Sequence, residues 1–168
     1  MIALVLGGEK SGKSDLAYSL FCQASGPGVI LAMGQARDAG FRRQILAHRL
    51  ARDPALPLEE PGQALPEALE RAAETGRNVL VDSLDFWVFA CLADLDGRMA
   101  RLEQALAAYA APGSPQCVLV SCEVGLGPVA ATSLVRRFAR AQGELNRRVA
   151  AVAQRVTLVV AGLPVSLK

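Results

Sequence analysis

The sequence lacks the features that mark several large classes of protein. It has one histidine, and its four cysteines form no C-x-x-C pair, so no familiar zinc constellation is present. A formal net charge of +2 is too small to indicate a nucleic-acid partner. Although 52% of the residues are hydrophobic, no apolar run approaches the roughly 20 residues needed to cross a bilayer. We expect a cytoplasmic protein with no membrane span.

The beginning of the chain is apolar but does not look like a targeting segment. Residues Met1–Gly8 carry no basic region and no cleavage site, so no signal peptide is predicted. A length of 168 residues is typical of one domain. We therefore treat residues 1–168 as a single domain.

Short β-branched runs alternate with Ala-, Leu- and Arg-rich stretches of helical period. This alternation predicts an α/β fold with a mainly parallel sheet, and the nearly continuous apolar runs indicate that helices cover both faces. A final strand pair is expected, in which Pro164 requires an edge position. The segment Asp53–Gly62 is too rich in proline for a helix and is interpreted as a loop across the carboxyl edge of the sheet.

The expected elements are the following. Strands are predicted at Ile2–Leu6, Val29–Met33, Asn78–Asp82, Cys117–Ser121, Val156–Ala161 and Val165–Leu167. Helices are predicted at Lys13–Gln23, Gly40–Arg52, Gly62–Thr75, Leu84–Ala93, Arg98–Ala111 and Ala130–Gln154.

A phosphate-binding motif lies between the first strand and the first helix. The eight residues match G-x-x-x-x-G-K-S/T: Gly7, Gly8, Glu9, Lys10, Ser11, Gly12, Lys13 and Ser14. The glycines let the backbone curl so that N–H groups and the helix N-terminus face phosphates. Lys13 adds a positive charge, and the Ser14 hydroxyl is suited to Mg²⁺. The motif predicts a P-loop nucleotide-binding protein.

Other polar residues follow later strands, at the edge where ligands collect in such sheets. Asp82 closes an apolar strand, as does the acid that assists Mg²⁺ binding in P-loop proteins, although it also fits a helix N-cap. Gly34 and Gln35 follow the second strand. Glu123 follows the fourth and is suited either to orienting a nucleotide or hydroxyl or to a solvated loop.

His48 permits two interpretations. It shares a helix face with Phe41 and Ile45, which fits a packed histidine bonded to a backbone carbonyl. A neutral imidazole is also able to attack an α-phosphate and form a phosphoramidate. Spacing alone favours the packed histidine.

The chain resembles a known family over essentially its whole length. The matching segments are LVLGGEKSGKS, Gly34–Asp38, Ile45–Arg49, LEEP, VLVDSL, VLVSCEVGLG, RRFARAQGELNRRVAAVA and VTLVVAGLPV. Together they are similar to the bifunctional adenosylcobinamide kinase and adenosylcobinamide-phosphate guanylyltransferase. The resemblance implies a RecA-like P-loop fold and a homotrimer.

The resemblance also implies two reactions in cobalamin biosynthesis. ATP or GTP phosphorylates adenosylcobinamide, and GMP then passes from GTP to the new phosphate through a guanylyl-histidine, which leaves pyrophosphate. It implies that His48 is the nucleophile, that Lys13 and Ser14 serve phosphate and Mg²⁺, and that Arg49, Glu59 and Asp82 contact nucleotide or metal.

The sequence departs from the family pattern in two places. The loop before Leu58 lacks the usual tryptophan, and Gly127–Thr132 lacks the usual Pro-Glu-Asn, which changes the groups available to hold a substrate or a metal there. The alternatives are a single-activity P-loop kinase or guanylyltransferase, a GTP-binding regulatory switch, for which no N-K-x-D sequence is found, and a non-enzymatic assembly subunit.

Overall fold

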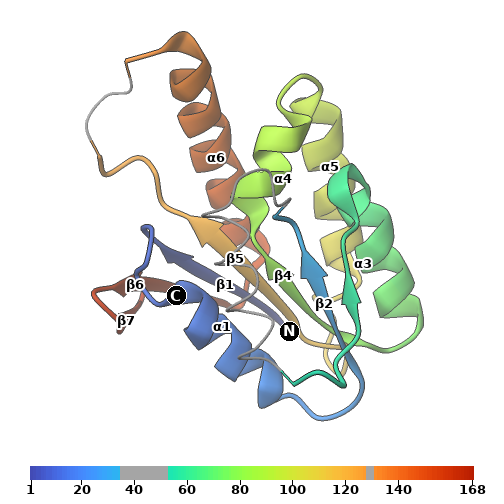
Figure 1. The fold of residues 1–168 in the computed structure, drawn as a ribbon. Coiled ribbons are helices and arrows are strands. Elements are labelled where there is room, and N and C mark those ends of the chain that lie inside the picture. The colour runs from blue at the N-terminus through green and yellow to red at the C-terminus, as the bar shows by residue number, and fades with distance from the viewer. Residues whose placement is uncertain (35–52, 128–130) are drawn as a thin grey trace.

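The computed structural model describes residues 1–34, 53–127 and 131–168. A seven-stranded sheet in the order β3-β2-β4-β5-β1-β6-β7 forms its centre (Figure 1). The strands are β1 (Ile2–Gly7), β2 (Gly28–Ala32), β3 (Leu58–Glu59), β4 (Asn78–Asp82), β5 (Cys117–Cys122), β6 (Arg155–Val160) and β7 (Leu163–Ser166). All pairs are parallel except β6 with β7, which confirms the expected α/β class and the terminal strand pair.

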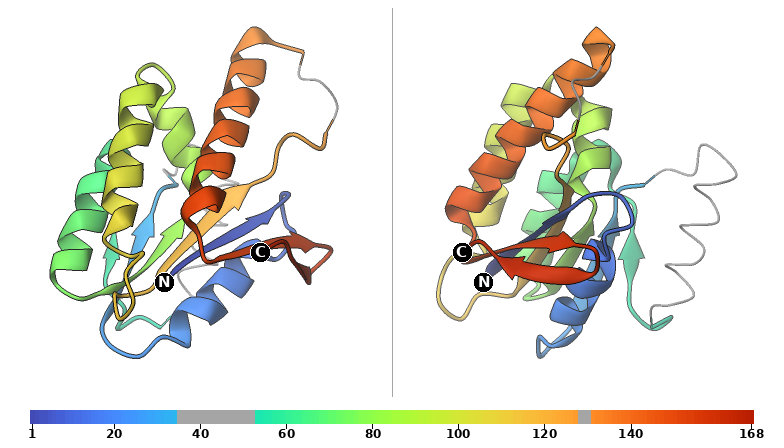
Figure 2. Two further views of the ribbon diagram at one scale, coloured as in Figure 1. Left: turned by 180° about the vertical axis from the view of Figure 1, so that it is seen from behind. Right: turned by 90° about the vertical axis from the view of Figure 1, so that its left-hand side faces the viewer.

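Helices cover both faces of the sheet, as Figure 2 shows from two sides. The helices are α1 (Lys13–Cys22), α3 (Leu65–Glu74), α4 (Leu84–Cys91), α5 (Leu95–Ala107) and α6 (Ser133–Val152), with a short 3₁₀ turn at Gly62–Ala64. Alternate strand residues point to opposite sides. Ile2 and Leu4 join the cluster under α3, α4, α5 and α6, whereas Ala3 and Val5 pack against α1.

A predicted loop and a predicted helix start differ from the structure. The proline-rich segment contains β3, an edge strand of two residues that pairs with β2 and is too short to show a period. Helix α5 starts at Leu95 rather than Arg98, because Leu95 and Met99 are buried in the core despite the low helix propensity of Gly97. The predicted helix Gly40–Arg52 lies outside the described residues.

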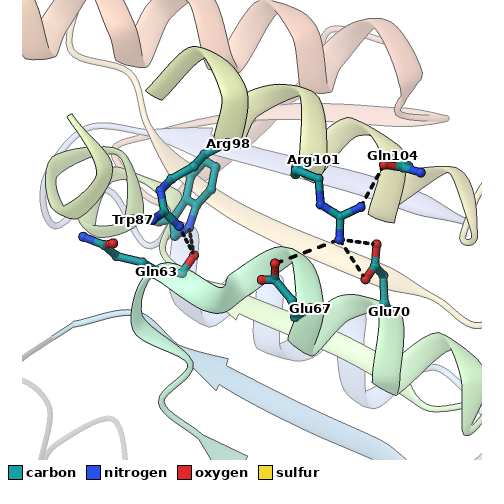
Figure 3. A network of polar contacts seen from close by, with 7 residues as sticks. All are labelled: Gln63, Glu67, Glu70, Trp87, Arg98, Arg101 and Gln104. Atoms are coloured by element: carbon teal, nitrogen blue, oxygen red, sulfur yellow. Dashed lines mark hydrogen bonds and ion pairs between the residues drawn. The ribbon is translucent and has the colours of Figure 1, made fainter. Parts of the chain in front are cut away.

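Trp87 of α4 is fully buried, and its indole N–H donates to the Gln63 carbonyl (3.2 Å). Figure 3 shows this contact beside an ion-pair network that links α3 with α5. Arg101 Nη2 lies 3.1 Å from Glu70 Oε1 and 3.9 Å from Glu67 Oε1, at partly exposed side chains. Exposed pairs contribute little, so packing around Trp87 dominates this layer. No helix among the described residues is long and apolar enough to span a membrane.

Tyr109 provides a test of this packing. Its buried hydroxyl donates to the Leu69 carbonyl (2.8 Å), and burial raises the pKa of the phenol. Tyr109→Phe should lower the free energy of unfolding by about 1–2 kcal/mol, because a buried carbonyl loses its donor. Chemical denaturation measures this change.

The matched control is Tyr18→Phe. Tyr18 accepts a hydrogen bond from the Asp53 amide near the surface, where water can replace it. Its loss should be less than half that of Tyr109→Phe. Equal losses would contradict the assigned role of the buried hydroxyl.

Candidate nucleotide-binding site

The loop between β1 and α1 is closed by a hydrogen bond within its own backbone. The Ser11 amide donates to the Gly8 carbonyl (3.3 Å), and Gly12 adopts a φ of 91°, in the left-handed region that favours glycine. Gly12 is also the N-cap of α1, with no side-chain cap. The first amides of a helix have no partner within the helix, and a glycine loop that leads into a helix start is the arrangement that binds phosphates.

Gly7 is required by close packing. A Cβ atom there would lie 2.4 Å from Ser11 Oγ and 2.9 Å from the Val159 carbonyl oxygen, whereas a Cβ at Gly8 meets nothing within 4 Å. Ser11 Oγ is itself buried without a hydrogen-bond partner among the described residues. The loop is therefore closely packed at Gly7, whereas a side chain at Gly8 would meet no protein atom within 4 Å.

Two neighbouring segments hold the loop in place. The Glu123 amide, just beyond β5, donates to the Gly7 carbonyl (3.2 Å), and the Gly162 amide, in the β6–β7 turn, donates to the Ser11 carbonyl (3.0 Å). Sequence reasoning did not predict the contact between Gly162 and Ser11. The signal for it in the sequence was the glycine between the two terminal strands.

Lys13 and Ser14 project from the first turn of α1. Lys13 Nζ donates to the Gly8 carbonyl (3.1 Å), so the ammonium lies over the loop. Ser14 Oγ donates to Asp82 Oδ1 (3.1 Å), which joins two residues 68 positions apart. The structure thus brings together the three residues to which the sequence assigns phosphate and Mg²⁺.

The donor set fits a hard divalent cation. A hydroxyl and a carboxylate side by side supply oxygen ligands, and Mg²⁺ in P-loop proteins takes few protein ligands and completes its shell with phosphate and water. Within the described ranges, no group of three His, Cys, Asp or Glu side chains could hold a metal alone. Any cation here would depend on Ser14, Asp82 and the nucleotide.

The other predicted residues fall in different places. Gly34 follows Met33, whose amide donates to the Asp82 carbonyl (3.0 Å), so this turn adjoins the end of β4. Glu59 ends β3, and its Oε2 lies 3.5 Å from Arg71 Nη2. Gln35, His48 and Arg49 lie outside the described residues.

Cys122 ends β5, and Glu123 follows it at the same edge. Glu123 Oε1 accepts the Gly125 amide (2.9 Å), a bond within its own loop. Burial, reinforced by the Asp85 carboxylate, raises the pKa of the Cys122 thiol to about 11, and the nearby Lys13 ammonium opposes the rise. Sequence reasoning did not single out Cys122 or Asp85, although Cys122 ends one buried strand and Asp85 lies shortly after another.

A family model described as cobinamide kinase / cobinamide phosphate guanyltransferase matches residues 3–167. The chain belongs to this family. A relative named bifunctional adenosylcobalamin biosynthesis protein CobP, from Pseudomonas aeruginosa, is 41% identical over 98% of this chain and 96% of its own. The protein named CobU from Escherichia coli is 31% identical over the full length of both chains.

Solved structures support the fold of this cobinamide kinase / guanyltransferase family member. An ATPase of a bacterial type III secretion system superposes with a TM-score of 0.62 at 15% identity, covering 98% of this chain and 56% of its own. The P4 protein of bacteriophage phi6, solved with ADP, gives 0.50 at 16% identity and covers 97% of this chain and 52% of its own. At such identities the likeness concerns the fold alone.

The packing around Gly7 predicts a difference between two glycines. Gly7→Ala should lower the free energy of unfolding of the nucleotide-free protein by about 1–3 kcal/mol, because the new methyl group overlaps a buried hydroxyl and a strand carbonyl. Gly8→Ala should change it by less than about 0.5 kcal/mol. Denaturant titration compares the two, and equal losses would refute the packing argument.

Proposed function

We propose that this chain phosphorylates adenosylcobinamide with ATP or GTP and then transfers GMP from GTP to the product. The final products would be adenosylcobinamide-GDP and pyrophosphate. The observation that carries the proposal is the Lys13, Ser14 and Asp82 arrangement at the phosphate loop, in a chain whose family match runs over residues 3–167. We treat residues 1–168 as one nucleotide-binding domain.

The triphosphate would lie over residues 7–14. The loop amides and the start of α1 would bind the phosphate oxygens, and Lys13 would exchange the Gly8 carbonyl for the phosphates. Gly34, beside the end of β4, allows close approach of a ligand to the backbone. Glu59 would contact the nucleotide from β3, at the same sheet edge, once it leaves Arg71.

Ser14 and Asp82 would hold Mg²⁺. When bound, the cation neutralises charge on the phosphate oxygens. The hydroxyl and the carboxylate are already in contact without it, so the two ligands need little rearrangement.

The guanylyl transfer is assigned to His48. This assignment rests on the resemblance of Ile45–Arg49 to the family's nucleotidyl-histidine segment, with Arg49 and Gln35 as nucleotide contacts nearby in sequence. The imidazole nitrogen would attack the α-phosphorus of GTP, and the bond to the pyrophosphate oxygen would break. The phosphate of adenosylcobinamide phosphate would then take the GMP group and release the histidine.

Replacing the imidazole separates the two reactions. His48→Ala should abolish protein labelling by GTP labelled at the α-phosphate and reduce guanylyl transfer by at least about 1,000-fold, because no covalent intermediate forms. Phosphorylation of adenosylcobinamide should continue. The label is measured on denatured protein, where a phosphoramidate is acid-labile.

Two results would contradict this assignment. Label that persists in His48→Ala would place the nucleophile elsewhere. A wild-type protein that phosphorylates adenosylcobinamide but never becomes labelled would favour a single-activity kinase.

We also propose a homotrimer in the cytoplasm. Exposed apolar residues occur on α4 (Phe89) and on α6 (Leu134 and Val135), and Phe89 makes an edge-to-face contact at 6.0 Å with the partly buried Phe138 of α6. Such a surface is typical of a subunit interface. Cys22, Cys91, Cys117 and Cys122 are all free thiols, as expected in a reducing compartment.

The oligomeric state is directly measurable. Light scattering should give about 53 kDa, three times the 17.7 kDa chain. Phe89→Glu should shift the protein toward smaller species, because a charge would be buried in the interface. A wild-type mass near that of one chain would contradict the trimer.

A further inference from the structure

Asp85 is an acidic residue that the proposed function leaves unused. It lies in the first turn of α4, three residues beyond the end of β4 and thus at the edge where the phosphate loop lies. The residue is half-buried, and its Oδ1 atom is fully buried without a hydrogen-bond partner in the described part of the chain. A buried carboxylate oxygen without a donor is unfavourable, so it calls for a functional explanation.

Asp85 and Lys13 both lie near the Cys122 thiol. Besides burial, the Asp85 carboxylate helps to raise the pKa of this thiol, and the Lys13 ammonium lowers it, so both charges act on the same side chain. Cys122 pairs with Gly7 across the β1–β5 ladder, so it lies directly beside the phosphate loop. Because burial raises the pKa of the thiol to about 11, Cys122 is protonated at neutral pH and cannot itself accept a proton.

Hydrogen bonds from α6 fix the end of β5 that carries Cys122. Asn146 of α6 donates through Nδ2 to the Cys122 carbonyl (3.0 Å). Ser121 Oγ donates to Asn146 Oδ1 (2.6 Å), and Gln142 Nε2 donates to Ser121 Oγ (2.7 Å), all at buried side chains. The position of Cys122 relative to Asp85 and Lys13 is therefore set by the core.

Other carboxylates at the edge already have partners. Asp82 accepts from Ser14, Glu123 accepts from Gly125, and Glu59 pairs with Arg71. Of these three and Asp85, Asp85 alone has a buried oxygen that accepts no hydrogen bond. Asp85 Oδ1 is therefore able to accept a hydrogen bond from a bound group, such as the hydroxyl of a nucleophile.

We propose that Asp85 is the general base of the phosphorylation step, the group that accepts the hydroxyl proton of the acceptor substrate. This inference rests on the proposed function. The hydroxyl oxygen forms a bond to the γ-phosphorus while its proton moves to the Asp85 carboxylate. The bond from the γ-phosphorus to the bridging oxygen breaks, the nucleoside diphosphate leaves with the electron pair, and Asp85 later releases the proton to water.

The two proposed reactions differ in their need for this base. The hydroxyl of adenosylcobinamide must lose a proton, whereas the phosphate of adenosylcobinamide phosphate is already an anion. Removing the base should therefore slow the first reaction and spare the second. A carboxylate near Lys13 also repels phosphates, so its removal should not weaken nucleotide binding.

The test measures both reactions on the full chain with Asp85→Asn. The kcat of adenosylcobinamide phosphorylation should fall on the order of 100-fold to 10,000-fold, the usual effect of losing a general base. The KM for ATP should stay the same or decrease. Guanylyl transfer from GTP to separately supplied adenosylcobinamide phosphate should stay within about threefold of wild type, which also shows that the site is intact.

Asp96→Asn is the matched control. Asp96 is an exposed acid in the first turn of α5, so its replacement removes the same charge from a similar helix position. Both reactions should stay within about twofold of wild type. A further variant, Asp85→Ala, should phosphorylate adenosylcobinamide roughly tenfold faster when formate, a small carboxylate, is added. Chloride should not increase the rate.

The outcomes separate this inference from the proposed function. Wild-type protein that does not phosphorylate adenosylcobinamide would contradict the proposed function. Active wild type with unchanged phosphorylation in Asp85→Asn would overturn the role of Asp85. Equal loss of both reactions in Asp85→Asn and Asp85→Ala, with no rescue by formate, would overturn it too, because Asp85 would then shape the edge rather than accept a proton.

Discussion

The site depends on the insertion of β5 between β1 and β4. Parallel pairing of β1 with β5 aligns Gly7 with Cys122, and the Glu123 amide continues the ladder to the Gly7 carbonyl. The same strand pairs with β4 on its other side. This arrangement sets the spacing at which Ser14 reaches Asp82. Asp82 ends β4, Ser14 lies in the first turn of the helix that follows β1, and the ladder determines the separation of the two strands.

Support for the phosphate loop comes from distant parts of the chain. The terminal β6–β7 hairpin contributes the Gly162 amide to the Ser11 carbonyl, and the Val159 carbonyl lies against Gly7. Helix α6 fixes the other side through the Asn146 bond to the Cys122 carbonyl. The β6–β7 hairpin and α6 thus hold the loop in one conformation from two sides. Less conformational entropy is therefore lost when a nucleotide binds.

The ends of helices and strands determine where the charged groups lie at this edge of the sheet. Lys13 and the N-terminus of α1 contribute positive charge, whereas Asp82 at the end of β4 and Asp85 in the first turn of α4 contribute negative charge. The thiol of Cys122, whose pKa is raised by burial and influenced by both Asp85 and Lys13, is neutral at neutral pH. A triphosphate and an acceptor group can therefore approach the same edge while meeting different electrostatic environments, which suits a transfer between them.

The sequence alone determined the layered α/β fold, the parallel sheet, the terminal strand pair and the phosphate loop, because strand hydrophobicity, helical period and the Gly-Lys-Ser motif are local signals. It also placed Asp82 at the end of a strand, where the structure has it. Strand β3 escaped detection because two residues carry no period, and the start of α5 depended on burial of Leu95 rather than on propensity. Only the tertiary structure brought Asp85, Cys122 and Lys13 together, since side-chain contacts between separate strands follow from strand order, which no local pattern encodes.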